Sequence, residues 1–500
     1  MFALLLLACG SEEILDTGSR DFEIEIQAAI EADIESTGAT AFSMAVIREG
    51  ELIWSGGFGA HTKSGVPVTA DTLFRVASLT KPMTAVSVLQ QVADGCLDLD
   101  SPVDAYLDGF VMEKQPTMAA DLLVRDALNM TGGLADYQIM TGDEGDGKLE
   151  AFIPYILEYG YFLSPPGRMY NYSNTNFVVA GRLVEICSGS SFRSTMEANL
   201  WEPLEMVSST FKTSDVVANG DYAIGVTTRW PEQIGEEVEL DAKSFAASQL
   251  WPAMGAWSSA NDLAMLGMFL MDGDADVLPT DLHTAMTSLQ VDSEEGYPSK
   301  GYGYGLNVKT GITMGDAQYP VTMIYHTGQI YGSSAHLYLI PELDIGVVAL
   351  INREFALPTK SVEAALDLAT FSQSESVTTE IPDEFSDYVG SYYNEFSIGT
   401  FILTSDESGL LIEIPSLDQQ GIGYEERLEA VRPDNFMIHY PDGSADALSF
   451  IRDQAGAVEY IRHRNYVGQR VDSSALRPVP SSAIPLAWWN SMDTVISVFE

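Results

Sequence analysis

The spacing of apolar residues predicts a helix and a hairpin at the start of the chain. Helical spacing predicts an amphipathic helix over 22–36, with apolar positions at Phe22, Ile24, Ile26, Ala29, Ile30 and Ile34. Two short apolar runs follow, 42–47 and 51–54, and the turn Glu49-Gly50 between them predicts a β-hairpin. Residues 79–94 have the pattern of a second helix, which Gly95 ends.

Strand patterns return late in the first 370 residues. They cover 302–308, 322–326, 333–340 and 344–351, and a helix is predicted over 359–371. Strands at both ends with helices between them predict an α+β domain over residues 21–372, whose single sheet takes strands from both ends of that domain.

The pattern changes again near residue 380. Short alternating runs occupy 400–404, 410–414, 436–440, 447–451 and 458–462, and turn residues separate several of them. This pattern predicts a small antiparallel β-barrel over 380–466, followed by a tail over 467–500. A chain of 500 residues exceeds the usual size of one hydrophobic core, which agrees with two domains.

Residues 1–20 are predicted to be a leader and tether. The apolar run that ends in Leu6-Leu7-Ala8-Cys9 resembles a bacterial lipoprotein signal, in which Cys9 would carry the lipid. We therefore expect an exported protein, periplasmic or at the outer membrane of a bacterium, whose contact with the membrane is made through Cys9. The alternative is a frayed N-terminus.

Cysteine is rare in this chain. Its three residues are Cys9, Cys96 and Cys187, too few for a disulfide framework. Because Cys187 follows the apolar helical stretch 177–186, we expect Cys96 and Cys187 to be two separate buried thiols rather than a pair.

The charge of the chain excludes one class of partner. Asp and Glu number 72 against 25 Lys and Arg, a formal net charge of −47. Such a surface repels phosphate backbones, so we expect no nucleic-acid partner. The acidic surface either keeps the protein soluble or selects a cationic substrate.

Three other patterns exclude a nucleotide, a metal cofactor and another hydrolase fold. Residues 142–148 have the spacing of a phosphate-binding loop, but Leu149 stands where Ser or Thr would bind magnesium. The six histidines show neither H-E-x-x-H nor paired spacing, so we expect no metal. The lack of a G-x-S-x-G elbow argues against an α/β-hydrolase.

Ser78-Leu79-Thr80-Lys81 is the first pattern with chemistry. On a helix, residues i and i+3 share one face, so the Lys81 amine can reach the Ser78 hydroxyl and activate it as a nucleophile. The predicted helix begins at this point, where free N–H groups favour a developing oxyanion. Alone, this spacing is common.

Two more patterns complete a set. Tyr172-Ser173-Asn174 offers a phenol that can relay protons and an amide that can hold a substrate. His326-Thr327-Gly328 ends a strand, whose edge could pair with an extended substrate. Lys309-Thr310-Gly311 competes for this third role; we prefer His326-Thr327-Gly328, because a long strand follows it.

Together these motifs resemble the superfamily of class C β-lactamases and D-alanyl-D-alanine peptidases, over roughly residues 25–370. Supporting matches are Asn129–Leu134, Tyr302–Gly305 and Ser258–Leu263. The resemblance implies an antiparallel sheet flanked by helices with an all-helical subdomain. The region from 380 resembles the small barrel that peptidase-like members append.

The resemblance also implies roles. Ser78 would form an acyl-enzyme, Lys81 and Tyr172 would shuttle its proton, and Asn174 would orient the acyl group. The strand His326-Thr327-Gly328 would bind substrate, with His326 where β-lactamases keep a lysine. Backbone N–H groups of Ser78 and Gln329 would form the oxyanion hole.

These roles predict a serine hydrolase that acts on a small-molecule, peptide or ester substrate. A D-Ala-D-Ala carboxypeptidase or D-amino-acid peptidase ranks close to a carboxylesterase. A β-lactamase ranks third, because an imidazole holds a substrate carboxylate less firmly than a fixed ammonium. The alternative from another class is a catalytically silent binding protein with the same fold.

Overall fold

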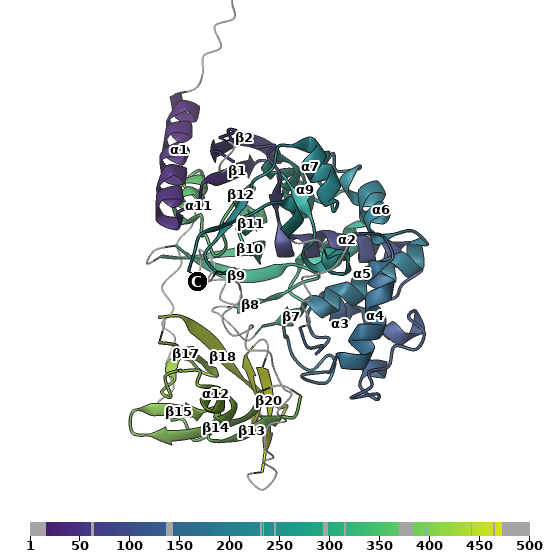
Figure 1. Ribbon diagram of the computed structural model, residues 1–500, viewed down its shortest axis with the longest axis vertical. Helices are drawn as coiled ribbons and strands as arrows, with labels where there is room; N and C mark the ends of the chain where they lie inside the picture. The colour runs from purple at the N-terminus through teal and green to yellow at the C-terminus, as the bar shows by residue number, and fades with distance from the viewer. Residues whose placement is uncertain are drawn as a thin grey trace, which may run out of the picture.

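An eight-stranded antiparallel sheet joins the start of the chain to residues 291–351, in the order β2-β1-β12-β11-β10-β9-β8-β7 (Figure 1). The structure is a computed structural model, and it describes residues 17–61, 65–136, 144–230, 233, 235–244, 247–293, 299–314, 317–369, 384–396, 398–441, 443–463 and 466–472. The strands are β1 (Ala41–Arg48), β2 (Glu51–Gly59), β7 (Val291–Asp292), β8 (Ser299–Tyr302), β9 (Asn307–Met314), β10 (Ala317–Ile330), β11 (Ser333–Ile340) and β12 (Ile345–Ile351).

The centre of this sheet pairs strands that are far apart in the sequence. Phe42 of β1 lies opposite Ile351 of β12, and Arg48 lies opposite Ile345. Both strands are nearly continuous apolar runs, and all of β12 is buried. Such runs fit strands that are covered on both faces.

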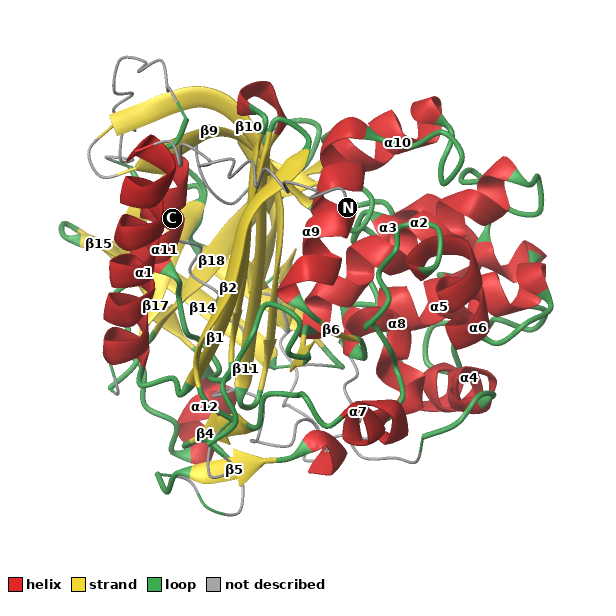
Figure 2. Cartoon of the chain, turned by 90° about the horizontal axis from the view of Figure 1, so that it is seen from above, coloured by secondary structure: helices red, strands yellow, loops and turns green. Residues whose placement is uncertain are grey.

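Helices cover the two faces of the sheet (Figure 2). One face packs against α1 (Thr17–Thr37) and α11 (Thr359–Leu366), with Ile26 and Ile30 of α1 fully buried. The Asp33 carboxylate joins these two helices, because it accepts hydrogen bonds from the backbone N–H groups of Lys360 and Ser361 at the start of α11. Helix α9 (Ala260–Asp272) lies on the other face, against β1, β11 and β12.

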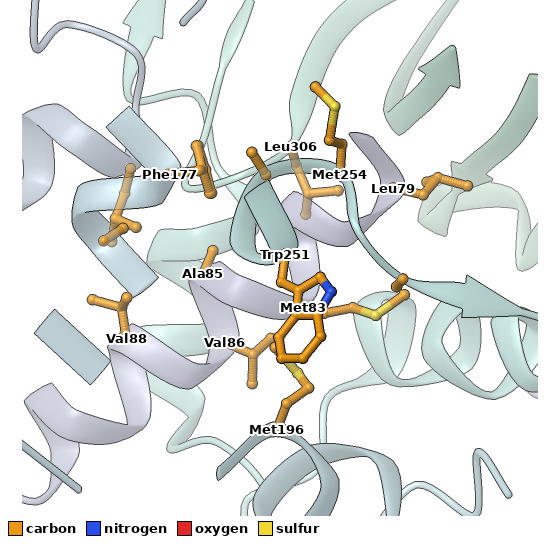
Figure 3. Close-up of a cluster of buried hydrophobic side chains, with 14 of the residues drawn as sticks. Leu79, Met83, Ala85, Val86, Val88, Phe177, Met196, Trp251, Met254 and Leu306 are labelled. Atoms are coloured by element: carbon orange, nitrogen blue, oxygen red, sulfur yellow. The ribbon is translucent and has the colours of Figure 1, made fainter. Parts of the chain in front are cut away.

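Beyond α9, the helical part of the domain packs around α2. This part comprises α2 (Thr80–Ala93), α3 (Val124–Leu128), α4 (Lys148–Tyr159), α5 (Asn174–Ser188), α6 (Phe192–Met196), α7 (Thr213–Asn219), α8 (Trp251–Met254) and α10 (Thr280–Thr287). Helix α2 is buried on almost every side, and its Met83 and Val86 pack with Phe177, Met196 and Trp251 from three other helices (Figure 3).

A second eight-stranded antiparallel sheet follows, in the order β15-β14-β13-β20-β19-β18-β17-β16. Its strands are β13 (Gly390–Asn394), β14 (Gly399–Asp406), β15 (Gly409–Glu413), β16 (Glu429–Arg432), β17 (Asn435–His439), β18 (Ala445–Arg452), β19 (Val458–His463) and β20 (Tyr466–Val471). Hydrogen bonds from Ile412 N to Glu426 O (2.7 Å) and from Leu428 N to Leu410 O (3.0 Å) join β15 to the chain that enters β16, so the sheet nearly closes into a barrel. Helix α12 (Pro415–Gln420) buries Leu417 in the barrel core.

The predicted fold class is confirmed, with local differences. Residues 302–308 are not one strand: β8 ends at Tyr302 and β9 begins at Asn307. Gly305, at φ +78°, turns the chain there, and a Cβ on it would lie 2.7 Å from Cβ of Ala85 on α2. A tertiary contact with α2 thus overrides the local strand pattern. Strand β20 runs five residues beyond the predicted barrel boundary at 466.

Some sequence predictions lie outside the described residues. These are residues 1–16 of the predicted leader and tether, with Cys9, and residues 473–500 of the predicted tail. Residues 17–20 of that tether belong instead to helix α1. Within the described ranges, no helix combines the length and the apolar character needed to cross a bilayer.

The prediction of two separate thiols is wrong, because Cys96 and Cys187 form a disulfide. Cys187 belongs to the last turn of α5, and Cys96 follows the C-terminal end of α2, against which α5 packs. The disulfide therefore links the C-terminal ends of α2 and α5. A helical pattern around one cysteine does not reveal which neighbouring helix carries the other.

Removing this disulfide should destabilise the protein strongly, because it closes a loop between residues 91 apart in sequence. Loop-closure entropy for a loop near this length is worth several kcal/mol, and losses on removal are typically about 2–5 kcal/mol. We expect the double variant Cys96→Ser/Cys187→Ser to lose that much free energy of unfolding in guanidinium titrations. A wild-type protein whose unfolding midpoint is the same with and without reductant would contradict the pairing.

Candidate active site

Ser78 lies in a 3₁₀ turn, Ala77–Leu79, directly before helix α2. The preceding residue, Ala77, has φ +45°, a left-handed conformation that is unfavourable for a residue with a Cβ. Such strain persists only where surrounding contacts impose it, and it is concentrated at functional sites. The Ser78 side chain is partly exposed, whereas Ala77 and Leu79 are buried. The turn therefore exposes Ser78 to solvent, while its two neighbours anchor the turn in the core.

Lys81 is fully buried one helical turn beyond Ser78. Its ammonium donates to Ser78 Oγ (3.0 Å), to Asn174 Oδ1 (2.6 Å) and to the carbonyl oxygen of Ala253 (2.8 Å). These three acceptors come from the nucleophile turn, the start of α5 and α8. A buried ammonium needs such partners, since desolvation without them is very costly.

Asp136 fixes the orientation of the Asn174 amide. Its carboxylate accepts from Asn174 N (2.9 Å) and from Asn174 Nδ2 (3.2 Å). The amide oxygen of Asn174 is thereby turned toward Lys81. The sequence motif places Asn174 at the site but not Asp136, which follows the supporting match Asn129–Leu134 and was missed.

Tyr172 lies beside the same ammonium. The Lys81 ammonium lies 4.8 Å from the centre of the Tyr172 ring, and that ring lies 6.3 Å from the ring of His326. The phenol is half-buried, so both Lys81 and a substrate in the site can approach it. The structure thus brings together Ser78, Lys81, Tyr172, Asn174 and His326.

The neighbours of His326 fix its tautomer. Its Nδ1 lies 2.6 Å from the carbonyl oxygen of Thr327, which can only accept, so Nδ1 donates. In the neutral ring Nε2 must then accept from the hydroxyl of Tyr302, 3.0 Å away. Burial, together with the charge of Lys81, lowers the pKa of His326 to about 3. His326 is therefore a neutral ring whose two nitrogens are both engaged within the protein.

Gly328 brings strand β10 into contact with the nucleophile turn. A Cβ at this position would lie 2.0 Å from the carbonyl oxygen of Val76 and 3.1 Å from Ser78 N. Only glycine allows this approach. The strand partners of β10 direct the Gln329 side chain away from the site, where its Oε1 accepts from Ser334 Oγ and from Phe355 N at 2.8 Å each. Only backbone groups of Gln329 can therefore serve the predicted oxyanion hole, which stays a prediction; Thr327 is partly exposed on the strand edge.

The competing motif Lys309-Thr310-Gly311 lies in β9. Lys309 is opposite Met323 of β10, three residues from His326 along that strand. Side chains alternate between the two faces of a sheet, so Lys309 shares the face of its partner Met323. Met323 packs with apolar residues of α1 and α11 on that face. His326 projects from the opposite face. The register therefore separates Lys309 from Ser78.

In this site a serine hydroxyl accepts a hydrogen bond from a buried lysine, and a tyrosine and a strand edge lie beside it. Serine hydrolases use sites of this kind to form acyl-enzymes. Among the described residues, no group of three His, Cys, Asp or Glu side chains could hold a metal ion.

Comparison with known proteins identifies the family. The family model described as Beta-lactamase matches residues 26–370, and the chain belongs to this family. Its members are usually serine hydrolases. A sequence relative, Unguisins hydrolase ungD' of Aspergillus campestris (strain IBT 28561), is 27% identical over 323 residues, covering 63% of this chain and 58% of that protein. The chain thus spans less than two thirds of the length of this curated relative.

Solved structures support the same fold. The crystal structure of SurE is 24% identical and has a TM-score of 0.67, covering 91% of this chain and 99% of that one. The D-amino acid amidase from Ochrobactrum anthropi SV3, complexed with D-phenylalanine, is 22% identical with a TM-score of 0.58, covering 69% of this chain and 98% of that one.

Gly328→Ala should impair reaction at Ser78 while leaving the protein folded. The new Cβ would force apart β10 and the turn that carries Ser78. Since a displacement of about 1 Å can cost about 100-fold in rate, we expect at least that loss in the rate of labelling by a fluorophosphonate. Gly346→Ala on β12 is the control, because a Cβ there would meet side-chain atoms of Leu339 and Ile47 rather than backbone. Equal labelling rates in the two variants would contradict the close approach.

The burial of His326 should also appear as a pH dependence of stability. Folded His326 takes up no proton until about pH 3, whereas an unfolded histidine takes one up near pH 6.5. Below pH 6.5 the unfolded state binds more protons than the folded state. The free energy of unfolding therefore falls as the pH falls from 6.5 toward 3. This histidine should contribute about 1.4 kcal/mol per pH unit between pH 4 and 6.

The test is urea unfolding at several pH values for wild type and His326→Gln, whose amide oxygen can replace Nε2 as an acceptor. The substitution removes the titrating group, so the variant should show a shallower slope of unfolding free energy against pH. Parallel slopes would show that His326 is already protonated in the folded protein.

Proposed function

We propose that this protein hydrolyses amide or ester bonds through an acyl-enzyme on Ser78. D-amino-acid peptides or amides and carboxylic esters are the preferred substrate classes, with D-Ala-D-Ala carboxypeptidase activity among the former; β-lactams rank third. The observation that carries the proposal is the hydrogen bond from the buried Lys81 to Ser78 Oγ, at 3.0 Å, in a turn that leaves Ser78 accessible.

The chemistry follows from these positions. The Lys81–Tyr172 pair acts as the base when it holds one proton fewer than an ammonium and a phenol together. Ser78 Oγ forms a bond to the substrate carbonyl carbon, and its proton passes to this pair. Backbone N–H groups of Ser78 and Gln329 stabilise the oxyanion. When the carbonyl re-forms, the bond to the leaving amine or alcohol breaks, and that group takes the proton from the pair. Water then attacks the ester on Ser78 by the same steps and releases the acid.

The state of His326 favours substrates that do not depend on a fixed cation for binding. The ring is neutral at physiological pH, and both nitrogens already have partners. It therefore offers no charge to the carboxylate that β-lactams carry. The name of one solved relative supports the amide class, since that protein is a D-amino acid amidase.

The disulfide supports export as a further part of this proposal. Stable disulfides are typical of oxidising compartments such as the bacterial periplasm. The Cys96–Cys187 pair thus agrees with the proposed exported protein. Attachment to a membrane through Cys9 is proposed from the sequence pattern alone.

The test is intact-protein mass spectrometry after incubation with a fluorophosphonate and, separately, a penicillin. We expect a one-to-one adduct on Ser78 in wild type and no adduct in Ser78→Ala. Ser190→Ala is the matched control, because Ser190 is exposed on the loop after α5 and should leave labelling unchanged. No adduct with either reagent would favour a catalytically silent binding protein.

Substrate class is then read from turnover. Release of ammonia from D-phenylalanine amide should exceed release from L-phenylalanine amide, and a chromogenic ester measures the esterase alternative. A chromogenic cephalosporin hydrolysed faster than either would overturn the proposed order and make β-lactams the first choice.

A further inference from the structure

The C-terminal barrel packs directly on the chain segment that leads to Tyr172. Leu163 and Met169 of this segment share a buried cluster with Ile451, Tyr460 and Val467 of the barrel. The barrel is therefore not a distant appendage, and its interface ends a few residues before the catalytic motif.

Arg462 of β19 makes a buried polar contact across this interface. Only 2% of its surface is exposed. Its guanidinium donates to the carbonyl oxygens of Tyr170 (2.6 Å) and Ser293 (2.5 Å), and to Ser449 Oγ (3.1 Å) within the barrel. It also lies 5.7 Å from the centre of the Tyr170 ring. Hydrogen bonds from a charged donor are among the stronger ones, and they require these carbonyls to stay in place.

The Tyr170 carbonyl is two residues before Tyr172 and four before Asn174. Other backbone support for the segment comes from Met130, whose carbonyl oxygen accepts from Asn171 N at 2.8 Å and whose Sδ lies 3.4 Å from Ser173 N. Helix α5 then begins at Asn174, whose backbone N–H donates a hydrogen bond to the Asp136 carboxylate. Met130 supports the segment from within the hydrolase domain, and Arg462 supports it from the barrel.

Two side chains of the segment add no hydrogen bond to this support. Asn171 and Ser173 are buried, yet the amide of Asn171 and the hydroxyl of Ser173 have no hydrogen-bond partner among the described residues. The Tyr172 ring has contacts of its own with Lys81, Tyr302 and His326. The backbone before it is held by hydrogen bonds to Met130 and to Arg462. Losing the bond to Tyr170 O removes one of them.

We propose that Arg462 is a positioning residue, through which the barrel holds the Tyr172–Asn174 segment in its productive place. The inference rests on the proposed function, because it assigns to the barrel a role in proton transfer at Ser78. Arg168 makes a second link, to Glu459 (2.5 Å) and to the Arg452 carbonyl oxygen (3.0 Å). The side chains of Arg168 and Glu459 are partly exposed, and exposed ion pairs contribute little.

The test compares Arg462→Met and Arg462→Lys with Arg470→Met. Arg470 is the matched control, since it also donates to backbone carbonyls, of Asp387 and Val389, but within the barrel. We expect Arg462→Met to lower kcat about 100-fold with KM nearly unchanged, the loss typical of a displacement of about 1 Å. Arg462→Lys should recover part of kcat, because an ammonium can still donate to one carbonyl. Arg470→Met should change kcat less than twofold even where it lowers Tm.

Hydrogen exchange gives a second readout that needs no activity. The amide of Asn171 should exchange faster in both Arg462 variants than in wild type, and should stay protected in Arg470→Met. If wild type proves inactive, this readout still tests the positioning role, so the two proposals fail separately. A rise in KM with kcat unchanged, or unchanged protection of Asn171, would overturn the role of Arg462 as a positioning residue.

Discussion

The architecture around the site depends on one buried positive charge. An ammonium in the interior is tolerated only when its donors are satisfied, and Lys81 has acceptors from three separate parts of the chain. Satisfying it fixes the distance between α2, α5 and α8, which also bury their apolar faces against one another (Figure 3). The lysine proposed to take part in activating Ser78 is therefore also a buried group whose hydrogen bonds the surrounding helices must satisfy.

Close contacts between backbone segments, in addition to hydrogen bonds, hold the sheet against the helical part of the domain. Gly328 lets β10 touch the turn of Ser78, and Gly305 lets the loop after β8 touch α2 beside Lys81. Each contact would fail with a single added carbon. The sheet and the helical part of the domain thus meet at glycines, and the strained Ala77 lies where the two bodies come together.

The sequence predicts the reacting side chains better than the groups that hold them. Ser78, Lys81, Tyr172, Asn174 and His326 belong to motifs with a chemical reason for each residue type, and the fold brings them together. The Ala253 carbonyl carries no side-chain signal.

Asp136, the disulfide partners and Arg462 depend on which segments become neighbours in space, and local spacing does not encode this. The break between β8 and β9 was missed for the same reason. The tautomer of His326 needed atomic neighbours, since the motif alone does not distinguish a charged from a neutral ring.

The pairing of β1 with β12 has a consequence for the order in which the molecule forms. Phe42 cannot meet Ile351 until about 310 further residues have been synthesised, which at 5–20 residues per second takes roughly 15–60 seconds. During that time one of the most apolar strands of the protein has no partner on this side. The open edge of β1 is a site for aggregation until β12 emerges, and the central sheet can form only after most of the domain has been made.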